Sequence, residues 1–446
     1  MHPLMVAADP DGGLVEHPDL CMIGALGAEP VAPDPEELSP VPAGSRFFTL
    51  PDHIPVGGDP ERDALQTVDE ADWGEGPVPL RAACVFPAPG WTRTLLPFGE
   101  RTVGPALPLW AYTALGYDPE VEDFVCAALQ VDDCPRWAPD AFDDRDLPPR
   151  VAEAKKRFPA NRLVGHLERC AAESHCFAAK NFFFGRWEMG IPIAPLCNAD
   201  CRGCISFQTD DLFEASHERI NFVPAAEEIR DIALPHLESA EKAVASFGQG
   251  CEGEPLLQAA LIECACRLLR GRTDRGTLHL NTNGSRPEWM GRLAAAGLDS
   301  LRISTNSFLP HWHRAYFRPD YTLQEVEDAA RAGVDAGLYT QVNYLVFPGV
   351  SDREAEVEAL LGFCRRTGLH VLQMKNLCID PDLYVATLGD VAQKGGAMGI
   401  AALMELLRAE IPRVALRYFN RPREEWHLDP RSAAPAPPAP QGEGRA

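Results

Sequence analysis

From about residue 184 onward, short apolar or β-branched stretches alternate with longer amphipathic segments. Short apolar runs bounded by turn residues indicate strands, whereas apolar residues spaced by three and four indicate helices. The pattern predicts strands at Trp187–Ile193, Ala243–Phe247, Thr277–Asn281, Ser300–Ser304, Thr340–Phe347 and His370–Lys375, and helices at Pro255–Leu269, Pro287–Ala296, Leu323–Ala336 and Asp352–Thr367. Because strands that alternate with helices form parallel sheets, we predict an α/β fold over residues 184–428. A partial or closed (β/α)6 TIM-like barrel fits better than a dinucleotide-binding fold, since no G-x-G-x-x-G follows the first strand.

The segments that flank this pattern differ from it. Residues 1–150 are rich in Pro, Gly and acidic residues, with short apolar stretches at 46–50, 82–86 and 94–96, and predict a small β-rich or irregular domain. Residues 151–183 are predicted to be a helical connector, because Val164, Leu167, Cys170 and Ala171 share the spacing of one helix face. Residues 429–446 are rich in Pro and Ala and are predicted to be a disordered tail.

Composition narrows the class of protein. The chain has 446 residues, 46% of them hydrophobic, and a formal net charge of −24. That charge makes nucleic acid an unlikely partner, because binding to nucleic acid depends on Lys and Arg that neutralise phosphates. There is no apolar run long enough for a membrane span and no basic, apolar leader, so we expect a cytoplasmic protein. In a reducing cytosol its 14 cysteines would be free for metal or redox chemistry.

Three cysteines lie close together after the first predicted strand. Cys197, Cys201 and Cys204 have the spacing C-x3-C-x2-C. Thiolates are the usual ligands of iron–sulfur clusters, and three thiolates would leave one metal position open for a ligand. The alternative is structural zinc, which needs further Cys or His ligands at suitable spacing. His311 and His313 are spaced H-x-H, which does not fit, but the cysteines by themselves leave both interpretations open.

The segments around the cysteines resemble the radical S-adenosylmethionine (radical SAM) superfamily over residues 184–420. The stretch from Phe247 to Pro255 resembles that superfamily's Gly-Gly-Glu-Pro motif, and polar residues end the later strands. Within the superfamily the subgroup that it resembles most is bacterial and has an N-terminal extension. The resemblance implies a 4Fe-4S cluster on the three cysteines and S-adenosylmethionine contacts at Gly250, Gly253, Glu254, Asn281, Asn283, Ser304, Asn306, Asn343 and Asn376. One departure is Gly203, which stands where the superfamily often has an aromatic residue before the third cysteine.

The resemblance also implies an activity. Reductive cleavage of S-adenosylmethionine at the cluster would give a 5′-deoxyadenosyl radical, which removes a hydrogen atom from a substrate. A one-electron donor such as ferredoxin or flavodoxin would supply the electron. The sequence does not identify the substrate, and a peptide or a small molecule is favoured. Cofactors of this kind carry the chemistry, while the protein positions them and excludes water.

Several residues near these segments have two interpretations. Cys251 is a candidate catalytic hydrogen donor or a small buried residue. His311, His313 and Tyr316 line a pocket or lie on a surface loop, and Asp380 and Asp382 belong to the site or to a turn at Pro381. The other cysteines that could hold a further cluster have no recognisable spacing, so we predict a single cluster; they are Cys134, Cys170, Cys176, Cys364 and Cys378.

Two other functions compete with the radical enzyme. The first is a binding or electron-transfer protein with a structural zinc or iron–sulfur site and no radical chemistry. The second is an RNA-modifying radical enzyme, which the charge of −24 disfavours. Metal content and salt-sensitive RNA binding would separate these alternatives.

Overall fold

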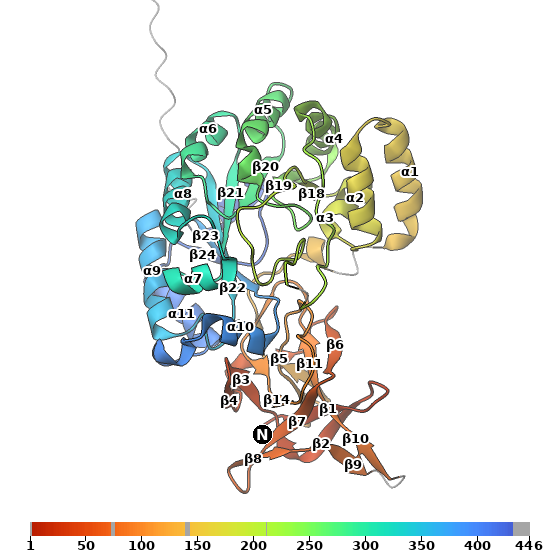
Figure 1. Cartoon of the computed structure of the whole chain (residues 1–446), viewed down its shortest axis with the longest axis vertical. Coiled ribbons are helices and arrows are strands. Elements are labelled where there is room, and N and C mark those ends of the chain that lie inside the picture. Colours follow the sequence, from red (N-terminus) through yellow and green to blue (C-terminus); the bar gives the residue numbers. More distant parts are fainter. Residues whose placement is uncertain (1, 73–75, 139–142, 211, 431–446) are drawn as a thin grey trace, which may run out of the picture.

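The computed structural model describes residues 2–72, 76–138, 143–210 and 212–430. Figure 1 shows three parts: a β-rich N-terminal domain below, a barrel of strands and helices above, and three helices beside the barrel. A β-rich N-terminal region therefore precedes the three helices and the α/β barrel. Among the described residues, every helix is too short or too polar to cross a membrane.

The barrel is built on one parallel sheet of seven strands that follow each other in sequence order. The strands are β18 (Glu188–Ile191), β19 (Val244–Phe247), β20 (Thr277–Thr282), β21 (Ser300–Thr305), β22 (Tyr339–Val346), β23 (Val371–Asn376) and β24 (Ala415–Arg417). All six predicted strands are present. Within the described residues no ladder joins β24 to β18, so the barrel is partial, and its open side is bridged by a 2.9 Å bond from Asn420 Nδ2 to Glu188 Oε1.

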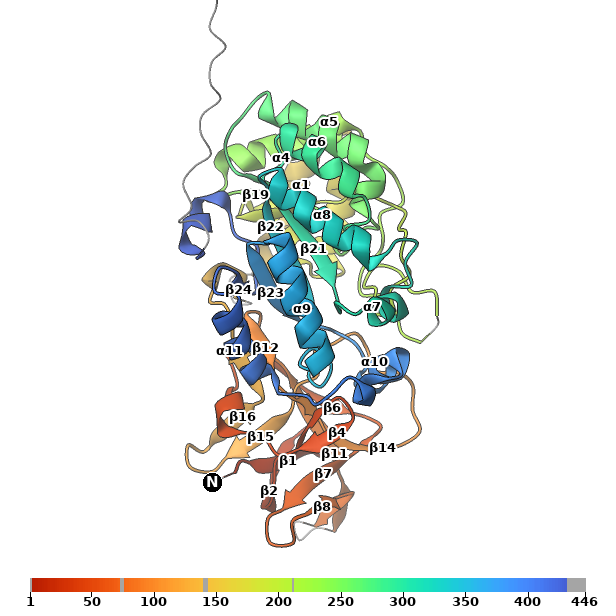
Figure 2. The same cartoon turned by 90° about the vertical axis from the view of Figure 1, so that its left-hand side faces the viewer.

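Helices cover the outer face of this sheet and the C-terminal ends of its strands (Figure 2). They are α4 (Ala226–Ser239), α5 (Ala259–Arg270), α6 (Met290–Ala295), α7 (Pro310–Phe317), α8 (Leu323–Asp335), α9 (Glu354–Thr367), α10 (Pro381–Leu388) and α11 (Ile400–Glu410). The four predicted helices correspond to α5, α6, α8 and α9, although two of them begin as the 3-10 turns η5 (Pro255–Gln258) and η6 (Pro287–Trp289). α4 escaped prediction, and it contains Pro235, a residue that normally ends a helix.

The connector is three helices: α1 (Leu147–Arg157), α2 (Arg162–Ala172) and α3 (Phe177–Phe184). It begins four residues before the predicted boundary. The expected face of α2 is buried: Val164, Leu167, Cys170 and Ala171 all belong to the core cluster of the barrel. The connector therefore packs as an extension of the barrel beside β18, and its residues can contribute to the barrel's interior.

The N-terminal domain is an antiparallel β structure, as predicted. Its strands are β1 (Leu4–Ala8), β2 (Leu14–Cys21), β3 (Gly24–Leu26), β4 (Glu29–Val31), β5 (Ser39–Pro40), β6 (Arg46–Leu50), β7 (His53–Asp59), β8 (Ala64–Thr67), β9 (Glu70–Asp72), β10 (Pro77–Pro79), β11 (Arg81–Phe86), β12 (Trp91–Arg93), β13 (Leu96–Pro97), β14 (Gly99–Arg101), β15 (Leu115–Asp118), β16 (Asp123–Cys126) and β17 (Ala128–Gln130). The expected strand at 94–96 forms only in part, because Thr94 and Leu95 link β12 to β13 while Leu96 begins β13 and pairs with Ala25 of β3.

Figure 2 shows β12 of the N-terminal domain beside β23 of the barrel, and side chains fasten the two domains there. Thr92 Oγ1 donates to Met374 O at 2.6 Å, and Arg93 N donates to Asn376 Oδ1 at 2.9 Å. The guanidinium of Arg93, fully buried, donates to Leu377 O at 2.7 Å. Because parallel-barrel active sites lie at the C-terminal ends of the strands, the N-terminal domain borders the region where a site is expected.

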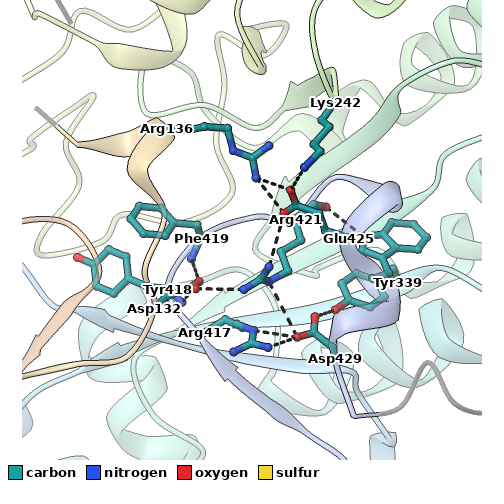
Figure 3. Close-up of polar contacts among 11 residues, drawn as sticks. Asp132, Arg136, Lys242, Tyr339, Arg417, Tyr418, Phe419, Arg421, Glu425 and Asp429 are labelled. Carbon is teal, nitrogen blue, oxygen red and sulfur yellow. Dashed lines mark hydrogen bonds and ion pairs between the residues drawn. The ribbon is translucent and has the colours of Figure 1, made fainter. Parts of the chain in front are cut away.

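A network of charged residues fixes the chain after β24 (Figure 3). Asp132 of the N-terminal domain accepts from Tyr418 N and pairs with Arg421, and Asp429 pairs with Arg417 and accepts from the hydroxyl of Tyr339. Asp429 is 3% exposed, so the prediction that a disordered tail starts at residue 429 is wrong for this residue. Residues 431–446 lie outside the described residues.

Candidate active site at the C-terminal end of the barrel

The three cysteines lie on the loop that leaves β18 at the C-terminal end of the barrel. Burial raises the pKa of Cys197 to about 11 and that of Cys201 well above its usual value, and the neighbouring thiols add to the rise at Cys201. As free thiols both therefore stay protonated at neutral pH. A bound metal would displace these protons, because thiolates are the ligating form.

The spacing of the three sulfur atoms bears on which metal they could hold. Among the described residues they are not all within 4.8 Å of one another, and they form no such group with a nearby His, Asp or Glu. One zinc ion would require four ligands at about 2.0–2.3 Å, hence ligand atoms in mutual proximity. A cluster of several irons places its thiolates farther apart. The donor set therefore fits an iron–sulfur cluster better than one structural zinc ion.

The loop after β19 packs directly on the cysteine loop. Gly253 N donates to Ala194 O at 2.6 Å and Glu254 N donates to Leu196 O at 2.9 Å. A side chain at Gly253 would overlap Leu196 O and place its Cβ 3.0 Å from Cys197 N, so only glycine permits this approach. The structure thus brings together the Gly253–Glu254 turn, which is predicted to contact S-adenosylmethionine, and Cys197, the first predicted cluster ligand. We call Gly253–Glu254 the cofactor turn.

The carboxylate of Glu254 is held from three sides. It accepts from Asn283 N at 2.8 Å, from Leu256 N at 2.9 Å and from the hydroxyl of Thr282. Asn283 Nδ2 in turn donates to Asn198 Oδ1 at 2.7 Å, inside the cysteine loop. Burial raises the pKa of Glu254 to about 7. Since a carboxylate has about four lone-pair sites, one acceptor position remains for a ligand.

Glu252 is a central residue of this loop that the sequence did not single out. Its Oε2 accepts from Ile193 N at 2.8 Å and Ala194 N at 3.0 Å, and its Oε1 accepts from Gly248 N and Gln249 N, both at 2.7 Å. Burial raises its pKa to about 8. The side chain ties the end of β18 to the end of β19. A carboxylate in a glycine-rich loop directly after a buried strand was the available signal, because such a group, once buried, needs several N–H donors.

The space left by Gly203 is filled from another part of the chain. A Cβ at Gly203 would lie 2.6 Å from the hydroxyl oxygen of Tyr316, and Arg202 N donates to Tyr316 O at 3.0 Å. Tyr316 and His313 are buried on α7, whereas His311 is about half exposed and faces Asp390 at 3.4 Å. α7 therefore replaces the surface loop considered for these residues, and Tyr316 places an aromatic ring beside the cysteine loop.

Arg219 was also missed, and it reaches the cysteine loop from the segment before α4. Its guanidinium lies 3.5 Å from Cys204 Sγ and 3.2 Å from the hydroxyl of Ser206. A cation at this position stabilises negative charge on a thiolate ligand. Nothing in the local sequence marks Arg219, because it lies 15 residues from Cys204 in a stretch without a regular pattern.

The remaining predicted cofactor residues fall into two groups. Gly250 approaches Ile205, which follows the third cysteine, Asn281 donates to Phe247 O at 2.9 Å, and Asn343 donates to Ser304 at 3.0 Å. These four residues lie around the cysteine loop or across neighbouring strand ends. The structure places Asn306 and Asn376 elsewhere: Asn306 donates to the Tyr384 hydroxyl at 3.0 Å, and Asn376 bonds to Trp91 O and Arg93 N of the N-terminal domain.

The structure also shows where Asp380, Asp382 and Cys251 lie. Asp380 caps α10 and pairs with Arg101 at 3.0 Å, and Asp382 pairs with the same guanidinium, so both join the domains. Cys251 is 2% exposed and lies against Cys170 of α2. Their hydrogen bond lowers the pKa of Cys170 and raises that of Cys251. The role of Cys251 as a hydrogen donor stays a prediction.

A cavity of about 500 Å³ opens next to these residues, between the barrel lumen, the connector and the N-terminal domain. Volumes of this order are typical of small-molecule sites. Two of its lining residues are cationic: Arg302 on β21 and Lys375 on β23. Burial lowers the pKa of Lys375 to about 7, and its Nζ lies 4.1 Å from the Tyr418 ring centroid. Other lining residues are Gln249, Asn281, Glu188, Trp137, Phe419 and His217.

Comparisons with known proteins agree with this geometry. Residues 191–361 match the family model of the Radical SAM superfamily. The superfamily uses a 4Fe-4S cluster and S-adenosylmethionine. The segment also resembles proteins named "Probable GTP 3′,8-cyclase". The one from Methanothermobacter thermautotrophicus is 29% identical over 180 residues, 40% of this chain and 55% of that protein. The one from Methanothermobacter marburgensis is 27% identical over 190 residues, 42% and 56%. The chain thus spans about 55% of the length of these relatives.

Two solved structures resemble this chain with TM-scores below 0.4. One is a spore photoproduct lyase with bound AdoMet and dinucleoside spore photoproduct, with a TM-score of 0.37, 16% identity and coverage of 52% of this chain and 77% of that chain. Another is HydG, a maturase of the [FeFe]-hydrogenase, with a TM-score of 0.33, 13% identity and coverage of 62% and 68%.

Proposed function

We propose that this protein is a radical SAM enzyme that cleaves S-adenosylmethionine reductively and acts on a small anionic molecule. The observation that carries the proposal is the contact between two loops. The backbone of Gly253 and Glu254 bonds to the cysteine loop, and Asn283 joins the Glu254 carboxylate to Asn198 of that loop. A cluster ligand set and an ammonium-binding turn therefore share one end of the barrel.

The residues on this end have distinct roles in the proposal. Cys197, Cys201 and Cys204 would hold the cluster, and Glu254 would orient the amino group of the methionine moiety through its free acceptor position. When bound, these cofactors supply a 5′-deoxyadenosyl radical that removes hydrogen from a substrate. Glu252 acts as a positioning residue, because its four N–H partners fix the start of the cysteine loop relative to β19.

The substrate class follows from the cavity. The half-buried side chains of Arg302 and, in its protonated form, Lys375 place positive charge in it, while the carboxylate of Glu188 is already engaged by Ser246 and Asn420. Cationic side chains favour phosphate or carboxylate groups. The ring of Trp137 stacks on Phe419 at the cavity wall and would suit a planar group. A substrate of the GTP type, which the relatives' names suggest, fits this chemistry, and other small anions with a flat ring fit it equally.

The electron donor belongs to the same proposal. Radical SAM enzymes need a reductant. Leu196 and Phe207 of the cysteine loop region are 68% and 50% exposed, so the cluster ligands lie near an accessible apolar surface. A ferredoxin or flavodoxin could approach there closely enough for electron transfer. We therefore include a small protein of this kind as the proposed donor.

The test is cofactor turnover by the full chain, reconstituted anaerobically and given dithionite and S-adenosylmethionine. We expect release of 5′-deoxyadenosine, and none from the Cys197→Ala/Cys201→Ala/Cys204→Ala variant. Cys364→Ala is the matched control, because Cys364 is buried on α9 away from the site. Protein with an intact cluster that releases none, even with cell extract as a source of substrate, would contradict the proposal.

Two outcomes would favour the competing functions. Stoichiometric zinc on the three cysteines, with no iron, would support a structural metal site without radical chemistry. Tight RNA binding that weakens steeply with salt would support an RNA-modifying enzyme. Binding measurements with GTP, pyrophosphate and an uncharged nucleoside would then identify the part of the substrate that Arg302 and Lys375 recognise.

A further inference from the structure

A second group of His and Cys side chains, outside the three cluster cysteines, lies behind the Gly253–Glu254 turn. His166 and Cys170 come from α2 and are one helical turn apart, so they share a face. Cys251 comes from the loop after β19, between Gly250 and Glu252. The possible ligand atoms of the three residues all lie within 4.8 Å of one another, and in the described part of the chain this is the one such group of His, Cys, Asp or Glu.

The distances suit one metal ion. Bond lengths of about 2.3 Å for zinc to sulfur and 2.0–2.1 Å for zinc to nitrogen put two tetrahedral ligand atoms about 3.5–3.8 Å apart. His166 Nε2 and Cys170 Sγ are 3.5 Å apart. The same closeness leaves no room for a cluster of several irons between the three residues, in contrast to the wider set at Cys197, Cys201 and Cys204.

The chemistry and the burial of the three side chains also fit the binding of one metal ion. His166, Cys170 and Cys251 are 1%, 3% and 2% exposed. Imidazole and thiolate together are the ligands that zinc prefers over calcium or magnesium. Two more residues with ligand atoms, Cys176 and His217, line the adjoining cavity, so a fourth ligand could come from either residue or from water.

We propose that His166, Cys170 and Cys251 bind one thiophilic divalent cation, zinc in type. The ion would join the connector helix α2 to the loop that carries Gly253 and Glu254. It would therefore hold the cofactor turn against the cysteine loop from behind, and Cys251 would serve as a ligand and not as a hydrogen donor. This inference does not depend on radical chemistry, and its test does not use activity.

The test is the zinc and iron content of the full chain, purified anaerobically without chelator. We expect about one zinc ion per chain in addition to the cluster iron. The Cys197→Ala/Cys201→Ala/Cys204→Ala variant should lose iron and keep zinc. His166→Asn and Cys170→Ser should lose zinc, while the control Cys364→Ala keeps both metals.

Three results would overturn the proposal. The first is wild-type protein that holds no zinc after growth in zinc and after addition of Zn²⁺. The second is zinc retained by His166→Asn and Cys170→Ser, or lost with the three cluster cysteines. The third is iron, instead of zinc, that disappears with Cys170→Ser.

A measurement on the wild-type chain avoids dependence on variants that fail to fold. Replacement of zinc by Co²⁺ should give the intense visible bands of a tetrahedral site and thiolate charge transfer. Chelation should lower the Tm, because an ion that binds only the folded chain stabilises it. Absence of the cobalt bands, or mass spectrometry that finds Cys170 and Cys251 joined as a disulfide in metal-free protein, would refute the site.

Discussion

The contact between Gly253 and the cysteine loop gives a sharp prediction for Gly253→Ala. The new Cβ would overlap Leu196 O and stand 3.0 Å from Cys197 N. Both neighbours are backbone atoms of the loop that carries the cluster ligands, so the added methyl can be accommodated only if one loop moves. The movement would weaken two hydrogen bonds, from Gly253 N to Ala194 O and from Glu254 N to Leu196 O.

The size of the effect follows from these contacts. Overpacking of a filled site costs about 1–3 kcal/mol. A weakened backbone hydrogen bond adds about 1 kcal/mol. We expect Gly253→Ala to lower the free energy of unfolding by about 3 kcal/mol, and to lower the iron bound per chain after reconstitution because Cys197 shifts relative to its partners.

The assay combines anaerobic urea unfolding with iron analysis on matched samples. Gly291→Ala is the control, because Gly291 lies on the exposed face of α6 with no atom within 4 Å of an added Cβ. In a helix this change should leave stability equal or raise it by up to about 1 kcal/mol. A Gly253→Ala protein within about 0.5 kcal/mol of wild type and with full iron would show that the two loops are not in the contact described.

Three further changes test other parts of the structure. Burial raises the pKa of Glu356 to about 7, so the folded state holds its proton more tightly than the unfolded state. Wild-type stability should therefore fall by about 3 kcal/mol relative to Glu356→Gln as the pH rises from 5 to 8 in denaturant titrations, and equal slopes would contradict this. Asp380→Asn should lower the free energy of unfolding by about 2–3 kcal/mol, because it breaks the ion pair between Arg101 and a buried carboxylate. Asp382→Asn should lower it by less than about 1 kcal/mol, because the Asp382 side chain is 58% exposed. Equal losses of stability in the two variants would refute the buried pair. Lys375→Met should weaken binding of GTP, measured by calorimetry, about tenfold or more, and an unchanged Kd would argue against an anion in the cavity.

The parallel sheet was predictable from sequence because each of its first six strands is a short apolar stretch between turn residues. β24 was not predicted, since Ala415–Arg417 is three residues long and has no pattern of its own. It forms because β23 offers an unpaired edge and because the Asp132 and Asp429 ion pairs hold the following segment in place. Such long-range contacts leave no local signal.

In the candidate site, too, residues within local motifs were predicted from the sequence, and residues that reach the site through tertiary packing were not. The cysteines and the Gly253–Glu254 turn are local motifs, and the structure brings them together as expected. Asn376 matched a polar strand end, but its partners are Trp91 O and Arg93 N, which come from a domain whose position the sequence could not place. Tyr316 and Arg219 reach the cysteine loop only through tertiary packing, so a search for motifs near the cysteines could not find them.

The contacts of Thr92 and Arg93 with β23 and Leu377 also affect the order in which this chain can fold. Thr92 bonds to Met374 O, 282 residues later, so the partners for this edge of the N-terminal domain leave the ribosome after most of the chain. Until then the guanidinium of Arg93 lacks the Leu377 carbonyl that it meets in the folded protein. Contacts this distant in sequence slow folding and leave a partly structured first domain waiting for the last strands. Truncation before β23 should therefore leave Thr92 and Arg93 of the N-terminal domain without these partners, and the domain less stable than in the full chain.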